Sequence, residues 1–158
     1  MINPLHWIAT CFGIGKIPHL GTSIATLLAI IFAIIIRHYL DNTMFIAITV
    51  GMFVLGLVAA ESYVNTAGSP SEVVIDEIVG MWVVLVIAYS FNYPADFATY
   101  LAAFISFRIF DGIKMWPISV IEESAGGGFG IMLDDVMAAA YGFLGMATML
   151  FFYKTLLF

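Results

Sequence analysis

The chain has 158 residues, of which 63% are hydrophobic and only 10% are charged. Soluble domains are about 45–50% apolar and about 25% charged, so this composition predicts an integral membrane protein with a single domain, residues 1–158. The net charge of −6 argues against nucleic acid as a partner, because nucleic acid requires a basic surface. The single cysteine excludes an internal disulfide and gives no support for a structural zinc site.

Five apolar stretches follow a mixed segment, residues 1–20, for which we expect a surface-lying helix and a loop. This segment has no Lys or Arg among its first fifteen residues, so we expect no signal peptide. The apolar stretches are residues 22–36, 44–60, 78–91, 97–110 and 136–150. Several are shorter than the roughly 20 residues of a full crossing. We therefore predict an all-α integral membrane protein with about five transmembrane helices, some of them short or re-entrant.

Five crossings would gather most charged groups on one side of the membrane, here called the near side, the side of Lys16. Only Asp41 and Asp96 among the 11 acidic residues would lie on the far side. The near side also receives Lys16, Arg108 and Lys114, which places it in the cytoplasm by the positive-inside rule. The near-side acids are Glu61, Glu72, Asp76, Glu77, Asp111, Glu122, Glu123, Asp134 and Asp135.

Adjacent carboxylates stand directly before two predicted spans, Asp76-Glu77 before the third and Asp134-Asp135 before the fifth. One interpretation is that these acids cap helices, but a cap needs one carboxylate and Asp111 stands at a helix end. Acids crowded on one face repel one another unless a cation lies among them. A hard divalent ion with oxygen ligands, Mg²⁺ in particular, would resolve this repulsion.

The near-side bases suit a phosphate group. Arg108 could bind phosphate in a bidentate way and the two lysines could add point charges, or Arg108 could simply pair with Asp111 while the lysines contact lipid headgroups. The run Gly126–Gly130 is expected to be a loop whose N–H groups approach a phosphate, with a metal bridging to the acids that follow. Other glycines are expected to allow close helix packing: Gly51, Gly56, Gly142 and Gly145.

Several catalytic classes lack their residues. Ile17, not Arg, stands six positions after Cys11, which excludes a cysteine-phosphatase loop, and no Ser-His-Asp set or G-x-S-x-G elbow is present. Metal-assisted chemistry on a phosphate-carrying substrate remains. The rival from another class is a small cation carrier, which would need polar groups along a path through the bilayer. The spans hold few such groups beyond Thr49 and Ser106.

Four segments together form a specific pattern: Gly13–Thr22 (GIGKIPHLGT), Val73–Gly80 (VVIDEIVG), Phe107–Ile118 (FRIFDGIKMWPI) and Gly127–Val136 (GGFGIMLDDV). In these segments, and over nearly its whole length, the chain resembles the phosphatidylglycerophosphatase A family. The resemblance implies Mg²⁺-dependent hydrolysis of the phosphate monoester of phosphatidylglycerophosphate to phosphatidylglycerol. It also implies a multi-pass protein of the inner (cytoplasmic) membrane with its active site facing the cytoplasm. A phosphatase for another lipid phosphate stays open.

The resemblance implies roles for individual residues. The expected metal or catalytic carboxylates are Asp76, Glu77, Asp111, Asp134 and Asp135, with Glu61 as a further metal ligand. The expected substrate-binding residues are Lys16, Thr22, Arg108 and Lys114. The chain departs from the family pattern at Leu20 and Met115, where proline is usual, and at Ser69, where an Asp is frequent. Ser69 could therefore not be an essential ligand.

Overall fold

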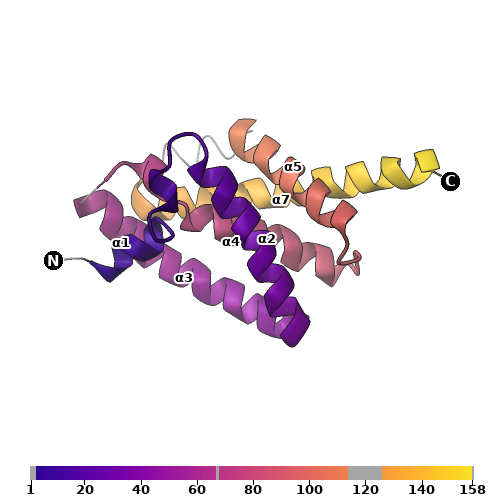
Figure 1. The fold of residues 1–158 in the computed structure, drawn as a ribbon, viewed down its shortest axis with the longest axis horizontal. Helices are drawn as coiled ribbons and strands as arrows, with labels where there is room; N and C mark the ends of the chain where they lie inside the picture. The colour runs from indigo at the N-terminus through magenta and orange to yellow at the C-terminus, as the bar shows by residue number, and fades with distance from the viewer. Residues whose placement is uncertain (1–2, 67, 114–125, 158) are drawn as a thin grey trace.

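The computed structural model describes residues 3–66, 68–113 and 126–157, and within these ranges the chain forms helices and no strand (Figure 1). The α-helices are α1 Pro4–Ala9, α2 Gly21–Tyr39, α3 Asn42–Thr66, α4 Ile75–Ser90, α5 Phe97–Ile113 and α7 Gly127–Leu157. Two short 3-10 turns are η1, Ile14–Lys16, and η2, Pro70–Glu72. Each of the five predicted spans lies within one helix, except that Phe91 of the third span follows the end of α4, and this confirms the all-α prediction.

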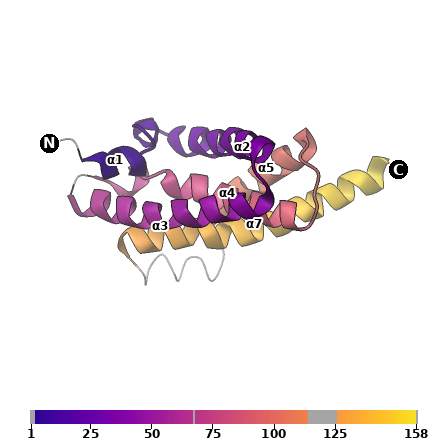
Figure 2. The same ribbon diagram turned by 90° about the horizontal axis from the view of Figure 1, so that it is seen from below.

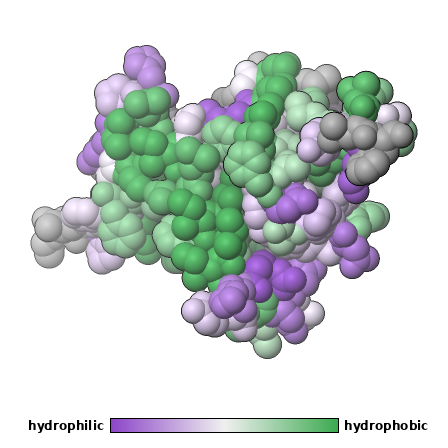
Figure 3. Space-filling model, turned by 45° about the vertical axis from the view of Figure 1, so that its right-hand side comes forward, coloured by the Kyte–Doolittle hydropathy of each residue, from purple (hydrophilic) through white to green (hydrophobic). Residues whose placement is uncertain are grey.

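The helices differ in their ability to cross a membrane. In the described part of the chain α2, α3 and α7 are long and apolar enough to do so. The other two predicted spans are shorter helices, with 16 residues in α4 and 17 in α5. Exposed apolar side chains such as Ile31, Val54 and Phe151 suit contact with lipid. Figure 3 shows a broad hydrophobic band on one face, with hydrophilic residues gathered toward an edge of it.

Helix α4 is the central helix of the bundle. It packs against α2, α3, α5 and α7, and its side chains are buried on nearly every side. A helix that is apolar all round is stable only when other helices cover it, and this surrounding explains why a short helix suffices here. The indole N–H of Trp82 donates to the Ala29 carbonyl of α2 at 2.8 Å, which ties α4 to α2 deep in the bundle.

The chain direction brings five helix ends together. α2, α4 and α7 begin where α3 and α5 end, at what we call the near end, and Figure 2 shows α3 and α7 side by side over much of their length. At the far end, the Asp41 carboxylate accepts a hydrogen bond from the Met44 N–H at 2.8 Å, and the Asp96 carboxylate accepts one from the Thr99 N–H at 2.9 Å. These two acids are therefore ordinary helix caps.

Glycines set the spacing of α7 against its neighbours. A Cβ on Gly142 would lie 3.1 Å from the Phe107 Cα of α5, and one on Gly56 would lie 2.6 Å from the Met132 Cε. Gly145 is similarly close to Ser106. The packing role expected of these three is confirmed. The same expectation is wrong for Gly51, where an added Cβ would meet nothing within 4 Å, because Gly51 faces outward from α3.

The N-terminal segment folds over the near end. Val74 donates its N–H to the Ala9 carbonyl at 2.9 Å, and a Cβ on Gly15 would meet the Glu72 carbonyl, so η1 packs directly on η2. Cys11 is half-buried in this segment, and burial raises the pKa of its thiol. A thiol with a raised pKa is a poor nucleophile at neutral pH, which agrees with the exclusion of cysteine chemistry from the sequence.

Candidate active site

A cavity of about 490 Å³ opens at the near end, between the starts of α2, α4 and α7 and the end of α5. Its lining combines carboxylates, one guanidinium and several hydroxyls with a few apolar side chains. The lining residues are Thr22, Ser69, Pro70, Ser71, Val73, Asp76, Glu77, Arg108, Asp111, Ile131, Asp134 and Asp135. Every one of the five expected catalytic carboxylates therefore lies at a single cavity, although they come from three helices that are far apart in the sequence.

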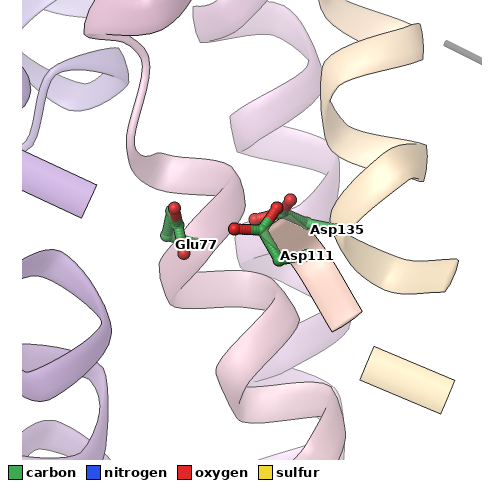
Figure 4. Close-up of side chains that lie close together, drawn as sticks. All are labelled: Glu77, Asp111 and Asp135. Atoms are coloured by element: carbon green, nitrogen blue, oxygen red, sulfur yellow. The ribbon is translucent and has the colours of Figure 1, made fainter. Parts of the chain in front are cut away.

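Three of these carboxylates form a tight group. Glu77 of α4, Asp111 of α5 and Asp135 of α7 each offer an oxygen, and the three oxygens lie within 4.8 Å of one another (Figure 4). The close approach of α4 and α7 depends on Gly80, since a Cβ there would lie 3.1 Å from the Asp135 Cβ and closer still to the Phe107 ring. Because Gly80 has no side chain, α4 and α7 can approach closely enough for their carboxylates to reach one ion.

Arg108 joins this group to the start of α2. Its Nη1 donates to Glu77 Oε1 at 2.6 Å and to Asp111 Oδ2 at 3.0 Å, and its Nη2 donates to Thr22 Oγ1 at 3.1 Å. The pair with Asp111 one helical turn away is the one that the sequence spacing predicted. Because Arg108 also reaches α4 and α2, its role extends beyond that local pair.

Burial makes the carboxylate group costly without a cation. The exposed fractions of Asp76, Glu77, Asp134 and Asp135 are 8%, 4%, 6% and 4%, while Arg108 is the one basic side chain among the described residues that line the cavity. Oδ2 of Asp135 is buried and has no hydrogen-bond partner among the described residues. Buried charges are normally paired or bind metal, and an all-oxygen donor set suits a hard divalent ion. The residues present therefore fit a metal ion.

The acidic pairs differ in their position on the helices. Asp76 and Glu77 stand in the first turn of α4, and Asp76 Oδ1 accepts the Glu77 N–H at 2.9 Å, as expected of a helix start. Asp134 and Asp135 were expected directly before a span, but they lie about two turns inside α7, which begins at Gly127. The capping interpretation therefore fails for the second pair.

The loop expected over residues 126–130 is wrong for residues 127–130, which belong to α7, while Gly126 precedes the helix. Because Gly127 and Gly128 have no side chain, the start of α7 can lie directly against α3. A Cβ on Gly128 would come within 2.3 Å of the Glu61 backbone nitrogen. The Gly128 N–H donates to Glu61 Oε2 at 2.6 Å, so this amide already has an acceptor within the protein.

The four remaining expected residues have different positions. Thr22 lines the cavity and holds Arg108. Lys16 is exposed on η1 and is not among the described residues that line the cavity. Glu61 lies beside the start of α7 and lines a separate hollow with Asn65 and Phe129. Lys114 lies outside the described residues.

Sequence reasoning missed three hydroxyl residues. Thr26 is fully buried in α2, and its hydroxyl lies 3.0 Å from Glu77 Oε2. Ser69 and Ser71 also line the cavity, with their hydroxyl oxygens 2.8 Å apart. Thr26 stands one turn after Thr22 on the same helix face, and this spacing is the signal that could have found it. Ser69 was considered only as a departure from the family's frequent Asp, and Ser71 was given no role.

The Thr26 contact gives a testable prediction. We expect Thr26→Val to lower the kcat/KM of the protein by about 10-fold, because losing an outer partner that orients a carboxylate of a site typically costs at least this much. Valine has nearly the same shape, so the fold should be retained. The matched control is Thr49→Val, since Thr49 is also buried but bonds only within α3, to the Phe45 carbonyl at 2.8 Å. Equal activity of the two variants would show that Thr26 does not orient Glu77.

Comparison with known proteins gives one consistent family. The sequence model described as Phosphatidylglycerophosphatase A matches residues 7–150. Proteins named Phosphatidylglycerophosphatase A from Haemophilus influenzae and Escherichia coli are 34% and 33% identical to this chain over 143 and 142 residues. These alignments cover 89% and 87% of this chain and 85% and 78% of the relatives.

A third relative has a different name. It is a "Putative phosphatidylinositol-3-phosphatase" from Bacteroides thetaiotaomicron, 37% identical over 149 residues, with 89% of each chain covered. No solved structure was found to match the chain. The match over most of the chain agrees with the four motif segments. The cavity brings together the residues that these motifs contribute: Asp76, Glu77, Arg108, Asp111, Asp134 and Asp135. The chain belongs to the phosphatidylglycerophosphatase A family and is a phosphatase.

Proposed function

We propose that this protein hydrolyses the phosphate monoester of phosphatidylglycerophosphate, giving phosphatidylglycerol and inorganic phosphate. The observation that supports this most is the cavity at the near end, where the carboxylates and Arg108 of the family motifs converge. The cavity lies at one end of a bundle whose outer surface is apolar. A lipid could therefore keep its acyl chains in the bilayer while its headgroup enters the cavity.

The chain's own residues would position the phosphate and balance its charge, which is most of what phosphoryl transfer requires. Arg108 would face the outer phosphate oxygens while its bonds to Glu77 and Asp111 hold it in place. Ser69 and Ser71 at the rim would hydrogen-bond to polar groups of the lipid headgroup. Either a water molecule or one of the carboxylates would attack phosphorus, and the bond from phosphorus to the glycerol oxygen would break, with that oxygen taking up a proton to become the free hydroxyl. If a carboxylate attacks, a water molecule would then hydrolyse the resulting acyl phosphate, releasing inorganic phosphate and restoring the carboxylate.

We further propose that the carboxylate group holds Mg²⁺. Glu77, Asp111 and Asp135 would be its ligands, and Asp76 and Asp134 would support them or hold a second ion. When bound, Mg²⁺ would neutralise negative charge on the transferring phosphoryl group. The proposed location is the cytoplasmic membrane with the near end facing the cytoplasm, which agrees with the sorting of basic residues.

The headgroup itself allows a second candidate. Because one relative is named as a putative phosphatidylinositol-3-phosphatase, a phosphorylated inositol lipid is the alternative substrate. Both substrates present a phosphomonoester on a polyol headgroup, so the carboxylate group would serve either. A cation carrier is less well supported, because the buried polar side chains of the described helices outside the cavity are hydroxyls such as Thr49, Thr99 and Ser106, not the charged groups that a path through the bilayer would need.

Metal removal tests the proposal. The purified protein in detergent should release phosphate from phosphatidylglycerophosphate in the presence of Mg²⁺, and EDTA should remove this activity. Readdition of Mg²⁺ in excess should restore the activity, because the protein stays folded when the ion is removed. The negative charge of the buried carboxylates is then no longer balanced by a cation and can bind one again. Phosphatidylinositol 3-phosphate, assayed in parallel, separates the two substrates. Release that persists unchanged in EDTA would contradict the metal, and no release from either lipid would contradict the activity.

A further inference from the structure

Glu61 was expected to bind the metal, but its surroundings indicate another role. Its carboxylate is engaged by the protein at both oxygens, with Oε2 accepting the Gly128 N–H at 2.6 Å and Oε1 accepting the Asn65 side-chain amide at 2.7 Å. It is absent from the group of described acids whose oxygens approach one another within 4.8 Å. It is likewise absent from the described residues that line the cavity.

The partner of Glu61 is the first turn of α7. The first N–H groups of a helix have no acceptor within that helix, and a carboxylate there is also favoured by the helix dipole. The contact is close at the backbone as well, since a Cβ on Gly128 would lie 2.3 Å from the Glu61 nitrogen. One on Gly127 would lie 2.6 Å from Glu61 Oε2. The start of α7 is thus fitted to Glu61 by both a hydrogen bond and shape.

The same helix carries two carboxylates of the cavity. Asp134 and Asp135 follow Gly128 by about two turns, a rise of roughly 10 Å at 1.5 Å per residue. A shift of the α7 start along α3 would therefore move the Asp135 oxygens relative to those of Glu77 and Asp111. We propose that Glu61 is a positioning residue, which caps α7 from α3 and so fixes the place of Asp135 in the carboxylate group.

Conservative and disruptive variants separate positioning from metal binding. Glu61→Gln keeps an oxygen that accepts from Gly128 but loses the negative charge of a ligand, so it should retain most of the activity and the wild-type requirement for Mg²⁺. Glu61→Ala should lower kcat/KM by at least about 10-fold, because misplacement on the order of 1 Å can cost about 100-fold. Loss of activity in Glu61→Gln equal to that in Glu61→Ala would overturn the proposal.

A glycine variant tests the same contact without touching any carboxylate. Gly128→Ala introduces a Cβ against the α3 backbone and should produce the same loss of activity as Glu61→Ala. The matched control is Gly51→Ala, where an added Cβ meets open space, and it should behave as wild type. Wild-type activity in Gly128→Ala would show that the α3–α7 spacing does not matter to the site.

The activity readout rests on the proposed function, so thermal unfolding in detergent provides an independent one. A ligand that binds only the folded state raises Tm. Mg²⁺ should raise the Tm of Glu61→Gln as much as it raises the Tm of the wild type. If Mg²⁺ raises the Tm of the wild type but not that of Glu61→Gln, Glu61 is a metal ligand and the proposal is wrong. Without metal, Glu61→Ala and Gly128→Ala should lower Tm while Glu61→Gln and Gly51→Ala should not. Equal Tm values for all four variants would overturn the proposal, even if the wild type released no phosphate.

Discussion

Asp135→Asn should lower kcat by more than about 100-fold, beyond what the loss of an outer partner of a metal site typically costs. Asp135 is the member of the carboxylate group with a buried oxygen, Oδ2, that has no hydrogen-bond partner among the described residues. The space around Asp135 is tight, since a Cβ on Gly80 would lie only 3.1 Å from the Asp135 Cβ. An asparagine of the same shape should still fit there. Asparagine keeps the shape but removes one negative charge and replaces an acceptor by a donor. The measurement is phosphate release at saturating lipid and Mg²⁺.

The matched control is Asp96→Asn, the same chemical change at the far end. Asp96 caps α5 through the Thr99 N–H, and asparagine caps a helix about as well as aspartate. Its activity and Tm should both be close to wild type. Asp135→Asn should also keep its Tm in EDTA but lose the rise in Tm produced by Mg²⁺. Near-normal turnover in Asp135→Asn would remove Asp135 from the proposed metal site.

The sequence predicted the helical architecture because the signal for it is strong. Long apolar stretches separated by turn residues such as Tyr93-Pro94 leave few alternatives to helices, and all five expected stretches are helical. The lengths were less predictable. α3 continues to Thr66, past the expected end near Glu61, and α7 begins at Gly127, well before its apolar run. At the near end, polar and glycine-rich turns extend these helices because neighbouring helices pack against them and accept their hydrogen bonds. Hydropathy alone does not predict that packing.

The cavity could be anticipated only in part. Sorting the acids by side, together with the family motifs, predicts that five acids share one face, and all five line one cavity: Asp76, Glu77, Asp111, Asp134 and Asp135. The sequence could not separate Glu61 from this set, since charge and membrane side are the same for all six. Only the packing of Gly128 on α3 shows that the Glu61 carboxylate points to a helix start.

Arg108→Lys should lower kcat/KM by about 100-fold or more, within the range found when a donor that stabilises transition-state charge is lost. Lysine keeps the positive charge, so the buried carboxylates stay compensated and the fold should be retained. It lacks the planar fork that lets one guanidinium bond to Glu77, Asp111 and Thr22 together. The loss therefore measures geometry rather than net charge.

The control for this substitution is Arg37→Lys in α2. Arg37 lies at the far end, where Nη1 donates to the Leu40 carbonyl at 2.9 Å and the guanidinium stacks over the Tyr89 ring. We expect its substitution to leave kcat/KM near wild type, because no carboxylate of the cavity is within reach. If Arg108→Lys also keeps wild-type kcat/KM, then charge alone suffices at this position, and the fork-like contacts of Arg108 serve the packing of α2, α4 and α5 rather than the phosphate.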